Sequence, residues 1–291
     1  MKNAFSYIAS VIASVLLVFC ILASVISVIG YTSVNEKKFK SIAASEHIDE
    51  KVCSELGRYF KERSSASGIP AEVYMNAIDS EYVSGIVDQK IDNGFHCLRG
   101  GNQSIDLSNA ELDASIERFF NDYADSINYE KDEKFAKKVD EAKNSAYRII
   151  GEFSDVYKFS ALEEHGVLSK VSKLYTKLDI IMTGSVAASV VLVIILLLLN
   201  LSSKSATLYW TGVSSLIAGI IGLAPTAYLL ATDYFSSFSI KQPQIFTAYT
   251  STLTMLTKTF MFASVGAAAA GIVLIIVYII IKPKNKASAA A

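Results

Sequence analysis

Few side chains of this 291-residue chain could bind a metal ion or act as nucleophiles. It holds three cysteines and three histidines, and the only set that could be imagined as metal ligands is His47, Cys53, His96 and Cys97. Along a helix, His47 and Cys53 would lie about 240° apart, and the neighbours His96 and Cys97 would diverge by about 100°. These angles do not bring four ligands together. The sequence therefore predicts surface histidines and no metal or other cofactor.

Cys53 and Cys97 could instead form a disulfide with each other. Both lie in the long polar segment after the first apolar stretch, which the charge pattern described below places in an oxidising compartment. A disulfide would clamp the helix that carries Cys53 to the end of the helix that carries Cys97. A buried free cysteine packs as a small apolar residue and needs no partner, so both states stay open.

Sequence motifs that carry catalysis through their mechanism are missing. The chain has no H-E-x-x-H zinc site, G-x-S-x-G nucleophile elbow, G-x-x-x-x-G-K phosphate loop or G-x-G-x-x-G dinucleotide fingerprint. Adjacent carboxylates such as Glu163 and Glu164 lie in charged stretches that are typical of solvated helix faces. A non-catalytic protein is the simpler interpretation, and the question of an enzyme stays open.

Four long apolar stretches dominate the rest of the chain. They cover residues 4–31, 180–201, 206–231 and 259–281, and none holds a charged residue at the depth of a bilayer core. About 20 apolar residues in a helix cross roughly 30 Å of hydrocarbon. Uninterrupted apolar runs such as 190–199 lack the alternation that a barrel strand needs. We therefore expect an all-α integral membrane protein with four transmembrane helices, embedded in the lipid bilayer of the cell membrane.

The flanking charges predict how these helices are oriented. Lys2, Lys204 and the lysines of the tail fall on one side without neighbouring acids, which is typical of the cytoplasmic side. The segment 32–179 carries 20 Lys and Arg against 27 Asp and Glu, a net charge of −7, and is expected to be extracytoplasmic. Both termini, the loop 202–205 and the tail 282–291 are then cytoplasmic, and the loop 232–258 is extracytoplasmic. Residues 1–31 are too long for a signal peptide and are interpreted as an uncleaved anchor.

Small residues gather on one face of the first, third and fourth predicted membrane helices. Small side chains let helices approach closely, and serines can form hydrogen bonds across the contact. The predicted packing positions are Ser6, Ser10, Ser14, Ser24, Gly212, Gly219, Gly222 and Gly271. A polar path along the serine face of the first helix is the alternative interpretation. Pro225 predicts a kink in the third helix.

The segment 32–179 shows the 3.6-residue apolar period of helices almost throughout. Each predicted helix has one apolar stripe, so an antiparallel bundle around a shared core, inserted between membrane helices 1 and 2, is expected. Its outermost helices are expected to continue these two membrane helices without a break. Ser108 and Glu111 fit a capping box at the start of one bundle helix. The predicted buried face of that helix consists of Leu112, Ile116, Phe119, Phe120, Tyr123 and Ile127.

This layout, an extracytoplasmic helical bundle between two membrane helices, resembles the input half of bacterial chemoreceptors and sensor kinases. The resemblance is one of layout, carried by no sequence motif, and assigns the chain to no family. Because the predicted cytoplasmic pieces are short, it implies that a sensor of this kind would signal through a partner.

The predicted outer loop 232–258 is rich in aromatic residues. Tyr234, Phe235, Phe238, Phe246 and Tyr249 lie in it, beside Pro243. Such side chains could anchor the loop at the membrane interface, pack beneath the bundle or line a ligand groove.

The expected function is that of a non-catalytic multi-pass membrane protein whose outer bundle binds a partner protein or ligand, in a sensing, adaptor or accessory role. An oligomeric channel or transporter lined by the serine face is the alternative, although no ionisable residue lies deep in a predicted span. A membrane enzyme acting on lipid or cell-wall material is the third hypothesis. Nucleic acid is not an expected partner because the outer segment is acidic. Self-association into a homo-oligomer stays open.

Overall fold

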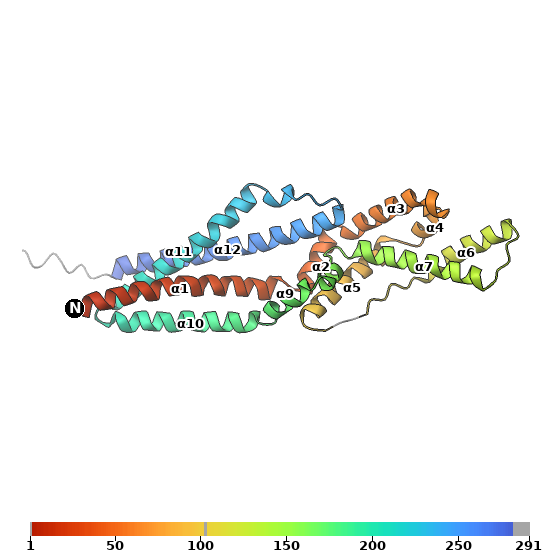
Figure 1. Ribbon diagram of the computed structural model, residues 1–291. Helices are drawn as coiled ribbons and strands as arrows, with labels where there is room; N and C mark the ends of the chain where they lie inside the picture. Colours follow the sequence, from red (N-terminus) through yellow and green to blue (C-terminus); the bar gives the residue numbers. More distant parts are fainter. Residues whose placement is uncertain (1, 102–103, 282–291) are drawn as a thin grey trace, which may run out of the picture. The chain divides into compact units, whose positions relative to one another are not determined.

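The computed structural model describes residues 2–101 and 104–281, and its regular structure in these ranges is entirely helical (Figure 1). The predicted tail 282–291 lies outside the described residues. The chain divides into two compact units. We call them the apolar unit, which comprises the residues before 35, residues 176–237 and those after 252, and the bundle unit, which comprises residues 35–175 and 238–252.

Four helices of the chain are long and apolar enough to cross a membrane. They include α1 (Lys2–Ser33), α10 (Leu178–Leu199), α11 (Lys204–Ala231) and α12 (Pro243–Ile281). The short 3₁₀ helices Leu201–Ser203 and Tyr234–Ser237 flank α11. The prediction of an all-helical protein with four candidate membrane helices is thereby confirmed.

The last of these helices begins much earlier in the chain than we predicted. Residues from Pro243 onward were expected to lie in a loop that ended at residue 258, and they are helical. Proline suits the first position of a helix because that position has no intrahelical partner for a backbone N–H. Within this part of α12, Thr250 Oγ1 donates to the carbonyl of Phe246, four residues earlier in the same helix, at 2.8 Å. The division between the two units therefore falls within α12.

Apolar side chains join α1 to α10 and α11 in the apolar unit. Ala13 and Leu17 of α1 and Leu196 of α10 form a buried cluster, against which the half-buried Trp210 of α11 packs. The ring of Trp210 also meets the ring of Tyr7 edge-on, with centroids 5.6 Å apart. Gly30 leaves room for Leu178, whose side chain would lie 3.3 Å from a Cβ atom at that position.

In the described residues, the bundle unit consists of eight helices and the first turns of α12. The eight are α2 (Glu36–Ser45), α3 (Ile48–Ser67), α4 (Ala71–Met75), α5 (Ser80–Leu98), α6 (Ala110–Ser126), α7 (Glu133–Ser154), α8 (Phe159–Glu164) and α9 (Val167–Tyr175). Helix α5 packs against α2, α3, α7, α8 and α9 and so forms the centre of the unit.

The core of the bundle unit follows the apolar stripes of α3 and α5. Val52 and Leu56 of α3 and Val83 and Ile86 of α5 are almost completely buried. Each such side chain contributes roughly 1.5–3 kcal/mol relative to an exposed one. Phe95 of α5 extends this core, since its ring meets that of Phe39 in α2 edge-on at 5.0 Å.

Two expected continuities of the helices are absent. Helix α1 ends at Ser33, and Asn35 adopts an extended backbone and caps α2 by accepting a hydrogen bond from the N–H of Lys38. A two-residue turn likewise separates α9 from α10. At the first place, an asparagine followed by an acidic residue is a start signal for a helix, and it ends the preceding run at the same point. The prediction of an unbroken helix was wrong there. Helices α9 and α10 still form one run, Val167–Leu199, of membrane-crossing length, interrupted by the turn at residues 176–177.

The cap of α6 also lies one residue later than predicted. Asn109, rather than Ser108, accepts hydrogen bonds from the backbone N–H groups of Glu111 and Leu112, at 2.9 and 3.0 Å. Its amide group additionally donates to the carbonyl of Ala77 at 2.9 Å. This second bond ties the start of α6 to the turn between α4 and α5.

Two glycines of α5 provide a matched test of this packing. A Cβ atom on Gly94 would lie 2.2 Å from the ring of Phe159, whereas a Cβ atom on Gly85 would have no neighbour within 4 Å. We expect Gly94→Ala to destabilise the bundle unit by about 2 kcal/mol, which accelerates amide hydrogen exchange in α5 by roughly 30-fold. Gly85→Ala should slow this exchange slightly, because alanine favours helix by up to about 1 kcal/mol. Equal exchange rates in the two variants would contradict the described packing.

A second glycine pair tests the apolar unit. A Cβ atom on Gly219 would lie 2.5 Å from the backbone nitrogen of Ala268 in α12, whereas one on Gly266 would meet nothing within 4 Å. We expect Gly219→Leu to separate α11 from α12 and to lower the thermal unfolding midpoint by several degrees, while Gly266→Leu leaves it unchanged. Trp210 is the only tryptophan of the chain, so its fluorescence in detergent reports this unit. A similar midpoint for both variants would be the contrary result.

Candidate functional site

The two cysteines of the predicted disulfide are free thiols in the structure. Cys53 lies within hydrogen-bonding reach of Ser80, the first residue of α5, whereas Cys97 lies near the other end of the same helix. Residues at these two ends are separated by roughly 25 Å, while a disulfide needs Cα atoms within about 7 Å. Of the two states that the sequence left open, the structure shows free thiols. Burial raises the pKa of both thiols, and the carboxylate of Glu163 adds to the effect at Cys97.

The serines predicted on one face of α1 contact α10 and α11. Ser14 Oγ lies 2.7 Å from Ser214 Oγ of α11, and Ser10 Oγ accepts a hydrogen bond from the amide of Asn200 at 3.0 Å. Ser6 donates to the carbonyl of Leu199 at 2.6 Å. Ser24 donates to Ser185 of α10 at 3.0 Å. The hydroxyl groups of this face are thus used in contacts between helices.

The predicted glycine positions lie where α11 and α12 approach each other. Cβ atoms on Gly212, Gly219, Gly222 or Gly271 would each lie less than 3 Å from an atom of the opposite helix. Ser215 adds a hydrogen bond across the same contact, to the carbonyl of Ala267 at 2.7 Å. Pro225 lies inside α11, which remains helical on both sides of it. The hydroxyl group of the following residue, Thr226, donates to the carbonyl of Gly222 at 2.9 Å.

The aromatic residues of the predicted outer loop divide between the two units. Tyr234 and Phe235 lie in a 3₁₀ helix of the apolar unit, and Phe238, Phe246 and Tyr249 belong to the bundle unit. Of the alternatives considered for these residues, the structure shows packing for Tyr249. Its hydroxyl group donates to the carbonyl of Tyr157 at 2.6 Å.

Polar contacts hold residues 238–252 against the rest of the bundle unit. The hydroxyl groups of Tyr157 and Thr252 lie 2.9 Å apart, and Lys51 Nζ donates to Thr247 Oγ1 at 3.1 Å. Burial raises the pKa of Tyr157 to about 12, so its hydroxyl group stays protonated and available for this bond. The side chain of Gln244 is 0% exposed. Its amide atoms have no hydrogen-bond partner among the described residues.

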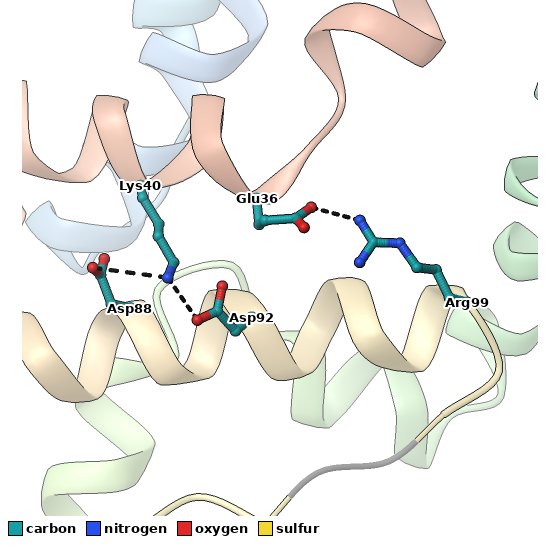
Figure 2. Close-up of polar contacts among 5 residues, drawn as sticks. All are labelled: Glu36, Lys40, Asp88, Asp92 and Arg99. Carbon is teal, nitrogen blue, oxygen red and sulfur yellow. Dashed lines mark hydrogen bonds and ion pairs between the residues drawn. The ribbon is translucent and has the colours of Figure 1, made fainter.

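Two sets of ion pairs join α2 to α5 (Figure 2). Lys40 of α2 points between Asp88 and Asp92 of α5, and its Nζ lies 4.0 and 2.6 Å from their carboxylates. Glu36, at the start of α2, accepts a hydrogen bond from Arg99 at 2.7 Å. Burial raises the pKa of Asp88, and Lys40 opposes that shift. The two sets comprise three carboxylates and two cations, a net charge of −1, and they fix how α2 lies on α5.

A hollow of about 550 Å³ near the start of α5 and α6 is lined by Asp79, Glu81, Asp106 and Glu111. Two of these carboxylates are engaged by backbone groups: Asp79 accepts from the N–H of Tyr82 at 2.8 Å, and Asp106 accepts from the N–H of Ser108 at 2.9 Å. The bonds from Ser108 lower the pKa of Asp106. An acid catalyst needs a carboxyl group that holds its proton near neutral pH, and the hydrogen bonds to Asp106 have the opposite effect.

The surface feature best suited to bind another molecule is a group of aromatic residues at the joined ends of α6 and α7. We call it the aromatic tip, and it consists of Phe119, Phe120, Tyr123, Tyr129 and Phe135. In Figure 1, the loop that joins these helices lies at the end of the bundle unit, past α3 and α4. The rings follow one another in contact: Phe119 and Tyr123 are stacked at 6.5 Å, and Phe135 lies 6.4 Å from both Phe120 and Tyr129.

The aromatic tip corrects the predicted buried face of α6. Leu112 and Ile116 are fully buried, as the helical period indicated. Tyr123 and Ile127, which continue the same stripe, are 58% and 52% exposed. The periodicity of a sequence tells which side of a helix is apolar, but not how far along the helix another element covers it. Here α4 and α7 pack on α6, and α4 has only five residues.

The ion pair of Glu36 with Arg99 predicts a pH dependence of stability. The hydrogen bond from Arg99 lowers the pKa of Glu36, so the pair stabilises the fold above the usual carboxyl range, and the stabilisation is lost as pH falls through the lowered value. Because both side chains are substantially exposed, we expect Glu36→Gln to cost less than about 1 kcal/mol at pH 7 and nothing near pH 3. Thermal unfolding followed by circular dichroism at both pH values measures the difference. Glu72→Gln, at an exposed residue of α4, is the control and should have no effect at either pH.

Comparison with known proteins assigns no relative: no protein-family model, curated protein or solved structure matches this chain.

Proposed function

We propose that this chain is a non-catalytic multi-pass protein of the cell membrane whose bundle unit lies on the extracytoplasmic side and binds a partner protein. In this role it serves as a sensor, adaptor or accessory subunit. The observation that carries the proposal is the aromatic tip, where five aromatic rings come together and Tyr123 is more than half exposed.

Exposed aromatic clusters are characteristic of protein interfaces. Single exposed apolar residues are common on soluble surfaces, but contiguous apolar groups usually mark an interaction site. Tyrosine is enriched among the residues that contribute most to protein–protein binding, because its large ring loses little conformational freedom on contact. The rings of the tip already hold one another in place, which lowers the entropic cost of binding.

The proposed orientation rests on the distribution of charge. Lys2 and Lys204 are the first residues of α1 and α11, and the lysines of the tail follow α12, without acidic residues beside them. The segment 32–179 has a net charge of −7. The positive-inside rule then assigns that segment to the outer side.

The contacts of the serine face support an anchoring role for the apolar unit over a conducting one. Ser10 and Ser14 are buried and bonded to Asn200 and Ser214. A serine that binds a neighbouring helix of the same chain is not available to line a path through an oligomer.

A photocrosslinking residue tests the proposal in cells that make the protein. We expect a benzoylphenylalanine at position 123 to attach covalently to a protein on illumination, because an interface at the tip brings a partner within reach. The same residue at position 72, which is exposed on α4, is the control and should give no specific adduct. Mass spectrometry of the purified products identifies what is attached. Equal yields at the two positions would argue against partner binding at the tip.

A further inference from the structure

We propose that the partner of the aromatic tip is the aromatic tip of a second copy of this chain, so that two bundle units associate about a twofold axis. This inference rests on the proposed function and names the partner. In the dimer, α6 of one copy lies against α7 of the other, with the rings between them.

The first argument is that the apolar stripe of α6 continues beyond the interface it already makes. Leu112 and Ile116 are buried within the unit, and Ser115 donates to the carbonyl of Val73 at 2.6 Å. Phe119, Tyr123 and Ile127 follow Ile116 at spacings of three, four and four residues, which keep them on the same side of the helix. The outer half of the stripe thus has the pattern of a helix contact and lacks a second helix to complete it. A helix from another copy would supply one.

The second argument is that, at the tip, the end of α6 carries a net negative charge and the start of α7 carries a net positive charge. The last eight residues of α6, from Phe119 to Ser126, include Asp122 and Asp125 and no basic residue. The first six residues of α7, from Glu133 to Lys138, contain three lysines and one glutamate. One edge of the tip is therefore acidic and the other basic, with net charges of −2 and +2.

A twofold axis makes such a surface complementary to itself. In a symmetric pair, each residue that contacts a second residue is contacted in return, so an acidic edge meets a basic edge twice. Asp125 already pairs with Lys131 of its own chain at 2.8 Å. Asp122 and Lys134 form no ion pair with any residue that the structure describes, and both are exposed. We therefore expect Asp122 of one copy to face Lys134 of the other.

The same charges disfavour the lipid surface as the occupant of the tip. Anionic head groups attract clusters of basic residues, and here Asp122, Glu130 and Asp132 surround the rings as well. The tip itself is small for a stable interface between free proteins. Two copies held in one membrane, however, meet at a raised local concentration, which compensates for a modest contact area.

Disulfide trapping tests the proposed geometry in the full chain. Replacing Cys20, Cys53 and Cys97 by alanine gives a background free of thiols and breaks no disulfide, since all three cysteines are free. In this background, Tyr123→Cys should form a covalent dimer under mild oxidation in lipid nanodiscs or vesicles. Leu174→Cys is the matched control: Leu174 is an exposed residue of α9 in the same unit, 59% exposed against 58% for Tyr123. It should remain monomeric.

Charge reversal tests the pairing across the axis without altering the rings. Asp122→Lys and Lys134→Glu should each lower the yield of the Tyr123→Cys dimer about tenfold, because like charges then face each other twice. The double variant Asp122→Lys with Lys134→Glu should restore the yield, since each lysine again meets an acidic residue. Circular dichroism of each variant verifies that the helices are retained.

The outcomes separate this inference from the proposed function. A Tyr123→Cys dimer that forms no better than the Leu174→Cys dimer, or a double variant as weak as its parents, overturns the symmetric pairing. A photocrosslink from position 123 to a different protein also overturns it, while the proposed function stands. An adduct with the mass of two copies supports both. The lack of any specific adduct at position 123 contradicts both.

Discussion

Burial of the apolar side of α5 is the interaction on which the bundle unit depends. This helix packs against five others, so its stripe of valine, isoleucine and phenylalanine residues meets neighbours that come from distant parts of the sequence. The close approach at Gly94 belongs to the same contact, because the ring of Phe159 occupies the space that a side chain would take. Polar interactions then orient the helices that burial holds together: Lys40 and Arg99 fix α2 along α5, and Asn109 ties the start of α6 to the turn between α4 and α5.

Contacts of a different kind hold the helices of the apolar unit together. Within lipid, the burial of apolar surface does not drive helices to associate. Close packing and hydrogen bonds must hold them together instead. Glycines at the contact of α11 with α12 and serines at the contact of α1 with α10 and α11 provide these two means. The ring of Trp210 contacts the rings of Tyr7 and Tyr209 and packs against the buried cluster around Leu17.

Sequence patterns predicted which helices are present better than they predicted where each helix ends and which other helices pack against it. The four apolar helices followed from length and composition, and the stripes of α3 and α5 followed from periodicity, because both depend only on residues near in sequence. The start of α12 was missed because the apolar stretch by which its span was recognised begins only at residue 259. The break at Asn35 was missed because the segment after residue 31 was expected to continue the first apolar helix. The choice between a disulfide and free thiols at Cys53 and Cys97 depends on the distance between the two ends of α5, which the positions of the cysteines in the sequence do not reveal. The exposure of the Tyr123 ring was missed for a related reason. An apolar stripe does not tell how much of its length is covered by another helix.

The free thiols of Cys53 and Cys97 have a consequence for the setting in which this protein folds. A domain clamped by a disulfide would require an oxidising compartment, and its cysteines would indicate on which side of the membrane it lies. Here Cys53 lies beside Ser80 and Cys97 beside Glu163, near opposite ends of α5, so neither thiol has the other as a partner. No covalent link between these cysteines therefore contributes to the bundle unit, whose helices are held together by packing and by the ion pairs of α2 with α5. The two cysteines thus do not indicate the redox compartment in which the bundle unit folds.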